Sequence, residues 1–372
     1  MMSIQLKDGG AGSAKAPPLV AVREARKAAR RAGLHYVTDE AAGITRHRTG
    51  SGMTYRGPRG QVIRNPDTLA RIRRFAIPPA WTGVWICRDP RGHLQATGRD
   101  ARGRKQYRYH DDWRATRDEG KFARMIAFGG ALPRIRRQVA RDLRREGREK
   151  VLATVVRLLE TTLIRVGNEE YRRTNHSVGL STMRDRHVSI RGDVLHFDFR
   201  GKGGKHHEID LRDRRLAKIV RSLQELPGQE LFQYIDADGR RQKITSTDIN
   251  AYLHAIGGAE FSAKDFRTWA ATVLAAVALN ETGKCEAKQA RHNLLTAIAQ
   301  VAQRLGNTPA ICRRSYIHPT VMECYLNGQT TVALGARTGA RLRRGMYGLS
   351  EEERAVLALL KAQAKAPVRF AR

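Results

Sequence analysis

The chain has 372 residues, and its 69 lysines and arginines against 36 acidic residues give a formal net charge of +33 and a pI near 11.0. This length exceeds that of one typical compact unit and predicts two domains with tails. The charge is far from that of an ordinary metabolic enzyme and predicts a polyanionic partner. DNA or RNA is favoured over an anionic membrane surface, because lysine and arginine release the counterions condensed on phosphates.

Other functions are disfavoured by what the sequence lacks. It has no apolar run of about 18 residues to span a bilayer, and residues 1–18 lack the apolar core of a secretory signal, so we expect no membrane and a cytoplasmic location. The absence of a GxxxxGK[ST] motif argues against ATP-driven work. The four cysteines form no CxxC pair, so we expect reduced thiols, no metal and no cofactor. Asp236 and Asp238 precede Gly239 and predict a solvated turn rather than a magnesium site.

The first third of the chain predicts a basic extension followed by a small β-rich domain. Residues 1–37 are expected to be partly disordered and to end in a short basic helix. Residues 38–112 alternate apolar and polar side chains in short segments separated by Gly, Pro, Asn and Asp. We expect strands within residues 43–50, 52–57, 60–65, 82–89 and 93–100, with one helix near residues 67–77.

Helical periodicity then dominates residues 113–345, which we expect to form the larger, catalytic domain. Residues 188–211 interrupt it, because alternation at period two returns on both sides of a Gly192-Asp193 turn and a Gly-rich loop, which predicts a three-stranded antiparallel sheet. Residues 346–372 predict a C-terminal helix and a basic tail. The fold class is therefore α+β, with a β-rich N-terminal domain and a mainly α-helical second domain.

One tyrosine stands in an unusual setting, in the segment NTPAICRRSYIHP. Thr308 and Pro309 predict the N-cap and first position of a short helix, near whose C-terminal end Tyr316 would lie. A tyrosine hydroxyl has a pKa of about 10 and attacks poorly at neutral pH unless cations stabilise the phenolate. A nucleophilic role therefore requires clustered positive charges.

Three cations occupy positions that ordinary surface charge does not explain. Arg165 follows an apolar helix, Lys202 lies in the Gly-rich loop of the predicted sheet, and Arg267 lies near the start of another apolar helix. Taken singly, each has a common structural explanation as a helix-dipole partner, a salt bridge or a solvated side chain. Their order and context are more specific.

These motifs resemble those of the type IB DNA topoisomerases, in the compact poxvirus-like branch found in bacteria, over residues from about 44 to 345. The first active-site arginine of that family matches Arg165 in RVGNEEY, and its lysine matches Lys202 in FRGKGGKHHE. Its second arginine matches Arg267 in KDFRT, and its nucleophile matches Tyr316 after GNTP. Many relatives have histidine where this chain has Asn307, an amide that could donate one hydrogen bond but carries no charge.

The resemblance implies a mechanism and a set of DNA contacts. Tyr316 would form a 3′-phosphotyrosyl linkage without ATP or obligatory metal, Lys202 would be the general acid, and Lys264 is a candidate helper. The fold implied is that of DNA breaking-rejoining enzymes, in a monomer that clamps double-stranded DNA on the bacterial nucleoid. The residues expected to touch DNA are Gln106, Tyr107, Tyr109, Asn168, Tyr171, Arg313 and Arg314.

Two alternatives stay open at this point. Tyrosine recombinases share the Arg, Lys, Arg and Tyr set, but they usually have His-x-x-Arg where this chain has Lys264-x-x-Arg267, and their N-terminal domain is helical. A non-catalytic, DNA-compacting protein would need only the net charge of +33.

Overall fold

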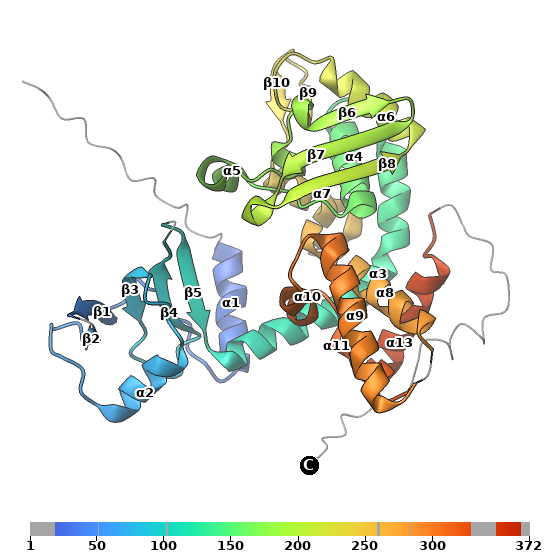
Figure 1. Ribbon diagram of the computed structural model, residues 1–372. Helices are drawn as coiled ribbons and strands as arrows, with labels where there is room; N and C mark the ends of the chain where they lie inside the picture. The colour runs from blue at the N-terminus through green and yellow to red at the C-terminus, as the bar shows by residue number, and fades with distance from the viewer. Residues whose placement is uncertain are drawn as a thin grey trace, which may run out of the picture. The chain divides into compact units, whose positions relative to one another are not determined.

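The computed structural model describes residues 19–50, 52–101, 103–258, 261–283, 285–328 and 347–365. Residues 1–18 of the basic extension therefore lie outside the described residues. The chain divides into two compact units, Met1–Lys121 and Phe122–Arg372 (Figure 1). The domain limits expected at residues 37, 112 and 345 stay predictions.

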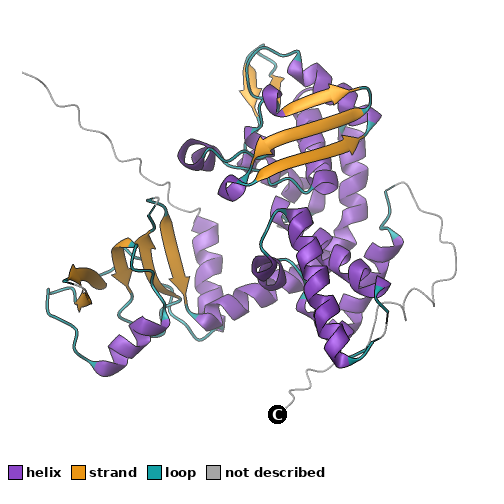
Figure 2. Cartoon of the chain, viewed as in Figure 1, coloured by secondary structure: helices purple, strands orange, loops and turns teal. Residues whose placement is uncertain are grey.

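The first unit is built on an antiparallel sheet. Along the chain, one helix precedes the first two strands and one helix follows them. Its five strands have the order β2-β1-β3-β4-β5; they are labelled in Figure 1 and drawn in orange in Figure 2. The elements are α1 (Leu19–Arg31), β1 (Ile44–Thr49), β2 (Gly52–Arg56), α2 (Pro66–Arg74), β3 (Thr82–Ile86), β4 (Leu94–Arg99) and β5 (Lys105–Tyr109). Asn65 caps α2 by accepting a hydrogen bond from the backbone N–H of Thr68.

One of the expected strands is absent, and another segment takes its place in the sheet. Residues 60–65 form only a bridge between Arg56 and Val62, because Gly57 and Gly60 make a turn and Asn65 already caps α2. The fifth strand is β5, which pairs with β4 and carries two of the expected DNA-contacting tyrosines. Four of the five expected strands are confirmed, and the assignment of residues 60–65 is wrong.

The second unit is mainly helical. The long helix α3 (Asp111–Asp142) begins in the first unit and continues into the second, where it is followed by α4 (Gly147–Thr162) and α5 (Glu169–Asn175). The later helices are α6 (Arg214–Gln224), α7 (Ser246–Gly257), α8 (Ala263–Glu281), α9 (Ala287–Leu305), α10 (Pro309–Ser315), α11 (Pro319–Leu326) and α13 (Glu351–Lys365). Short 3-10 turns are η1 (Leu180–Thr182), η2 (Asp185–His187) and η3 (Lys202–Gly204).

The sheet predicted between residues 188 and 211 is confirmed. Strands β6 (Val188–Arg191), β7 (Val194–Arg200) and β8 (His206–Arg212) are antiparallel in the order β6-β7-β8, and Gly192 makes the first turn with φ of +57°. A small hairpin of β9 (Gln233–Ile235) and β10 (Arg241–Lys243) was not expected. Asp236 accepts hydrogen bonds from the backbone of Asp238 and Arg240, so this acidic segment is the turn between β9 and β10.

One large apolar core holds the second unit together, with α4 at its centre. Leu152, Val155, Leu158 and Leu159 of α4 have no exposed surface. The side chains of β7 that face this core are also apolar, namely Leu195, Phe197 and Phe199. Among the described residues, no helix is long and apolar enough to cross a membrane.

The position of α4 generates a stability prediction. Leu152→Ala should lower the free energy of unfolding of the second unit by about 2–5 kcal/mol, because it leaves a cavity in a fully buried site. Leu295→Ala on α9, where the side chain is 58% exposed, is the matched control and should change it by less than about 0.5 kcal/mol. Urea denaturation followed by circular dichroism measures both, and equal losses would contradict the packing described.

Candidate active site

Arg165 is positioned by a tight crossing of two backbone segments. The helix α4 ends at Leu163, which takes a left-handed conformation with φ of +58°, and turns the chain into the Arg165 loop. The carbonyl oxygen of Arg165 accepts a 2.9 Å hydrogen bond from the backbone N–H of Leu180 in η1. A Cβ built on Gly179 would lie 2.6 Å from the same oxygen and 2.5 Å from the backbone nitrogen of Gly167. Only glycine therefore allows this approach.

Arg267 is a buried charge in the first two turns of α8. Its side chain is 5% exposed, and its guanidinium donates to the carbonyl oxygens of Leu163 and Leu305. No carboxylate among the described residues pairs with it. Burial lowers the pKa of Arg267 to about 10, and the nearby positive charge of Arg165 acts in the same direction. The two arginines are therefore held together at an electrostatic cost.

Tyr316 lies directly after α10, as the sequence predicts. Thr308 caps this helix and Pro309 is its first residue. The Cζ atom of Arg267 lies 5.6 Å from the centroid of the Tyr316 ring. Burial would raise the pKa of Tyr316, but the positive charges of Arg267 and Arg165 outweigh burial and lower the pKa below the usual value of 10.0. Lys264, expected as a helper, adds to this lowering.

Lys202 lies in η3, in the loop between β7 and β8. It lines a small cavity of about 20 Å³ together with Arg165 and Arg267. The structure thus brings the three cations chosen from the sequence to one place, and Arg267 connects them to Tyr316. Arg165 and Arg267 are more than 100 residues apart in the sequence, so only the tertiary fold brings them together.

Asn307 lies at the junction of α9 and α10, next to Arg165. Its side-chain oxygen accepts a hydrogen bond from the Arg165 guanidinium, and its backbone oxygen accepts one of 3.2 Å from Lys205 Nζ. Within the described part of the chain, Asn307 Nδ2 and Arg267 Nε are buried nitrogens without an acceptor. Buried N–H groups normally have a partner, so both are available to a bound oxyanion.

Sequence reasoning missed His207, which fills the space between two loops of the site. A Cβ on Gly201 would lie 2.7 Å from its ring, and a Cβ on Gly306 would lie 2.5 Å from it. The ring stacks on Phe199, and burial and the charges of Arg165 and Arg267 lower its pKa. His207 thus separates the Lys202 loop from the Asn307 junction. The pair of histidines before Glu208 was the only signal in the sequence.

The expected DNA contacts are surface residues of separate elements. Tyr107 and Tyr109 on β5 are 44% and 36% exposed, and their rings stack with centroids 5.9 Å apart. Gln106 donates a hydrogen bond to Asp100. Asn168, Arg313 and Arg314 are exposed around the site, whereas nothing is described of the Tyr171 side chain.

The cysteine nearest to Tyr316 in the sequence is Cys312. Cys312 is buried on α10, and burial raises the pKa of its thiol, which fits a structural role. In the described segments, no three His, Cys, Asp or Glu side chains are grouped so that they could hold a metal ion.

Comparison with known proteins gives matches over both units. Residues 110–333 match the family described as eukaryotic DNA topoisomerase I, catalytic core, and residues 52–100 match the N-terminal domain of bacterial DNA topoisomerase IB. The DNA topoisomerase 1B of Acanthamoeba polyphaga mimivirus is 33% identical over 295 residues, which cover 77% of this chain and 88% of the viral protein. The DNA topoisomerase 1B of Vaccinia virus is 25% identical over 61% of this chain and 70% of its own length.

These matches and the mixed α+β fold define a DNA topoisomerase. More particularly, the chain belongs to the type IB family, with a bacterial-type N-terminal domain. The resemblance based on four short motifs is therefore confirmed.

The crossing at Gly179 generates a prediction. Gly179→Ala should slow any reaction that depends on Arg165 by about 100-fold, because an added methyl group displaces the Arg165 backbone. Gly130→Ala on α3, where a Cβ meets nothing within 4 Å, is the control and should retain full activity. Plasmid relaxation assays measure both, and wild-type activity in Gly179→Ala would contradict the role of the crossing.

Proposed function

We propose that this protein relaxes supercoiled DNA through a covalent intermediate on Tyr316, without ATP. The observation that carries the proposal is the placement of Tyr316 against Arg267, whose guanidinium is 5% exposed and lies 5.6 Å from the ring centroid. Together with Arg165, this charge lowers the pKa of the Tyr316 hydroxyl. A tyrosine activated in this way can act as a nucleophile.

The proposed reaction is a reversible exchange of phosphate esters. The Tyr316 oxygen attacks a backbone phosphorus, a bond forms between them, and the bond to the 5′ oxygen of the next nucleotide breaks. The strand end becomes a 5′-hydroxyl, and the phosphate stays on Tyr316 as a 3′-phosphotyrosine. After the cut strand swivels, the 5′-hydroxyl attacks the phosphorus and restores both the DNA and the tyrosine. Bond energy is conserved, so the cycle needs no energy source.

Cations and N–H donors would stabilise the charge that builds on the phosphate. Arg165 and Arg267 suit the two non-bridging oxygens, because guanidinium groups make forked hydrogen bonds to phosphate. Asn307 Nδ2 and Arg267 Nε, two buried donors without acceptors among the described residues, fit the same oxygens. In this role Asn307 supplies a hydrogen bond while its own oxygen orients Arg165.

The leaving 5′ oxygen needs a proton, and Lys202 is the proposed donor. It lines the same small cavity as Arg165 and Arg267, in a Gly-rich loop where Gly203 and Gly204 have positive φ. Such a loop can bring the ammonium group to the DNA. Lys264, whose charge acts on Tyr316, is the proposed helper.

For the DNA complex, we propose that a monomer closes around the duplex, with the two units contacting it as a clamp. Each unit carries candidate contacts, namely the exposed tyrosines of β5 in the first and Asn168, Arg313 and Arg314 in the second. Tyr171 is included on its motif alone. With DNA as the substrate, we expect the protein on the nucleoid of a bacterial cell.

The tyrosines of β5 generate a prediction about binding. Tyr107→Ala combined with Tyr109→Ala should weaken DNA affinity by about tenfold, because exposed aromatic rings contribute apolar and stacking contacts. The slope of log affinity against log salt should stay as in wild type, since no positive charge is lost. Fluorescence anisotropy at several salt concentrations measures both quantities. Unchanged affinity would remove β5 from the interface.

The central test is plasmid relaxation in EDTA without ATP by wild type and Tyr316→Phe. Wild type should relax positive and negative supercoils, and the variant should lose relaxation and the covalent adduct while it keeps DNA affinity, because only one hydroxyl is removed. Binding without relaxation by both proteins would favour a DNA-compacting role. Strand exchange between duplexes would favour a recombinase.

A further inference from the structure

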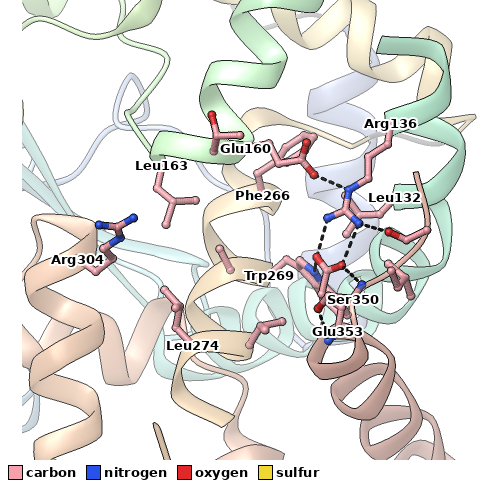
Figure 3. A pocket seen from close by; sticks show the side chains of 15 residues that line it. Leu132, Arg136, Glu160, Leu163, Phe266, Trp269, Leu274, Arg304, Ser350 and Glu353 are labelled. Atoms are coloured by element: carbon pink, nitrogen blue, oxygen red, sulfur yellow. Dashed lines mark hydrogen bonds and ion pairs between the residues drawn. The ribbon is translucent and has the colours of Figure 1, made fainter. Parts of the chain in front are cut away.

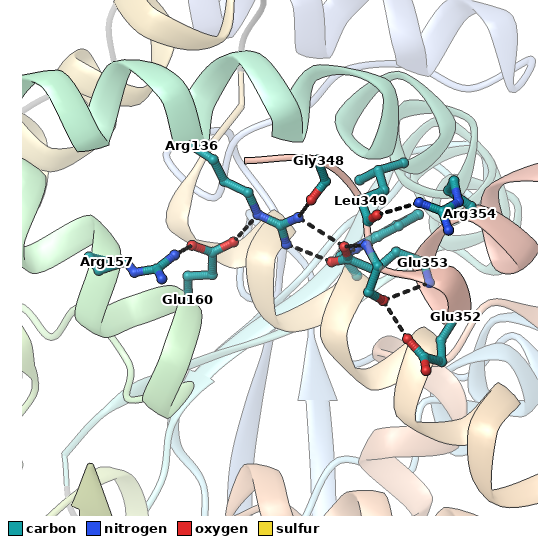
Figure 4. A network of polar contacts seen from close by, with 10 residues as sticks. Arg136, Arg157, Glu160, Gly348, Leu349, Glu352, Glu353 and Arg354 are labelled. Atoms are coloured by element: carbon teal, nitrogen blue, oxygen red, sulfur yellow. Dashed lines mark hydrogen bonds and ion pairs between the residues drawn. The ribbon is translucent and has the colours of Figure 1, made fainter. Parts of the chain in front are cut away.

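A buried ion-pair network joins the C-terminal helix to three helices of the core. The Arg136 guanidinium on α3 contacts Glu160 of α4 at 2.6 Å and Glu353 of α13 at 2.7 Å (Figure 4). All three side chains are between 12% and 16% exposed. These partners raise the pKa of Arg136, and Arg136 lowers that of Glu353, although burial alone would shift each in the opposite direction. The network is therefore charged and desolvated, so its geometry is energetically important.

The network reaches α8 through Trp269. Its indole nitrogen donates a 3.1 Å hydrogen bond to Glu353 Oε1, and Trp269 lies two residues after Arg267 on the same helix. The opposite end of the network is Glu160, three residues before Leu163, whose carbonyl oxygen accepts from the Arg267 guanidinium. One guanidinium, that of Arg136, is thus tied both to α8, which carries Arg267, and to α4, at whose end Leu163 accepts from Arg267.

A cavity lies beside these contacts, next to α8. A cavity of about 580 Å³ runs between the network and the end of α4, and its lining includes Leu163, Phe266, Trp269 and Arg304 (Figure 3). Leu163 and Arg304 also line the small cavity that holds Arg165, Lys202 and Arg267. The polar contacts of Trp269 and Arg136 at the edge of the cavity therefore act together with the apolar packing of Phe266 and Trp269, which are each 3% exposed, to position α8.

The helix that supplies Glu353 lies outside the residues that match the catalytic-core family. The family match ends at residue 333, whereas α13 begins at Glu351. Ser350 fixes the start of α13, because its backbone N–H donates to Glu353 Oε2 over 2.8 Å. The Glu353 carboxylate therefore receives hydrogen bonds from α3, α8 and its own helix start, and can hold only one orientation.

We propose that Glu353 is a positioning residue for DNA cleavage: through Arg136 and Trp269 it fixes α8, and so holds Arg267 against Tyr316. This role rests on the proposed function of Tyr316. Glu353 touches neither substrate nor the reacting atoms. It acts on the reaction through the distance between a guanidinium and a phenol, and this distance controls how easily the phenol loses its proton.

The loss of the Tyr316 hydroxyl proton determines the direction in which Glu353→Gln changes the cleavage rate. The Arg267 charge favours the Tyr316 phenolate, so a displaced Arg267 raises the pKa of Tyr316. The phenolate is the attacking form, so the cleavage rate rises with pH up to this pKa. In Glu353→Gln the curve of rate against pH should therefore move to higher pH, by about one to two units. At neutral pH the rate should fall by about 10- to 100-fold.

The test compares the single-turnover rate of covalent adduct formation on a DNA duplex at a series of pH values. The control is Asp142→Asn. Like Glu353→Gln, it removes the charge of a buried carboxylate, but Asp142 lies at the end of α3 and accepts a 2.7 Å hydrogen bond from Tyr252 of α7. Asp142→Asn should lose stability and keep the wild-type pH midpoint. Trp269→Phe keeps an aromatic ring but loses the contact to Glu353 and part of the packing of a side chain that is 3% exposed, so it should slow cleavage by about threefold with a smaller shift in the same direction.

The outcomes separate the two proposals. An alkaline shift in Glu353→Gln and Trp269→Phe, with unchanged DNA affinity and no shift in Asp142→Asn, supports the positioning role. Wild-type midpoints in both variants, or the same shift in Asp142→Asn, would overturn it while leaving Tyr316 as nucleophile. A wild-type protein that forms no adduct at any pH would instead overturn the proposed function.

Discussion

The buried charge of Arg267 is the constraint around which the second unit is organised. A guanidinium that is 5% exposed and unpaired by any described carboxylate is costly, and the fold compensates with two backbone carbonyl oxygens. Those oxygens belong to Leu163 and Leu305, the residues at which α4 and α9 end. The same junctions carry Arg165 and Asn307. Holding one cation in place therefore places the other groups of the site.

Much of this arrangement can be predicted from the sequence, because the signals are local. Thr308 and Pro309 mark the start of α10, and alternation around Gly192 marks the hairpin of β6 and β7. The order of the motifs carries the family assignment, which the comparisons confirm. The roles of the individual site residues stay predictions, supported by their placement.

What the sequence does not contain is the information about crossings between distant segments. Nothing local shows that Gly179 must pass Gly167 without a side chain, or that His207 fills the gap beside Gly306. The network of Arg136 and Glu353 joins residues 217 apart, and each reads in sequence as one more charge among many. The error at residues 60–65 arose differently. There the local sequence pattern predicts a strand, but the turn at Gly57 and Gly60 leaves only a single bridge.

The anchoring of the backbone around Tyr316 has a mechanical consequence. The hydroxyl of Thr272, fully buried on α8, accepts a hydrogen bond from the backbone N–H of His318 and shares its own proton between the carbonyl oxygens of Thr268 and Tyr316. A DNA strand bound covalently to Tyr316 would pull on this segment while the duplex unwinds under torsion. Because the backbone is tied to α8 next to Tyr316, that load would pass into the helical core rather than into the seven-residue helix α10. The attachment point can then bear torque without losing the alignment needed for rejoining.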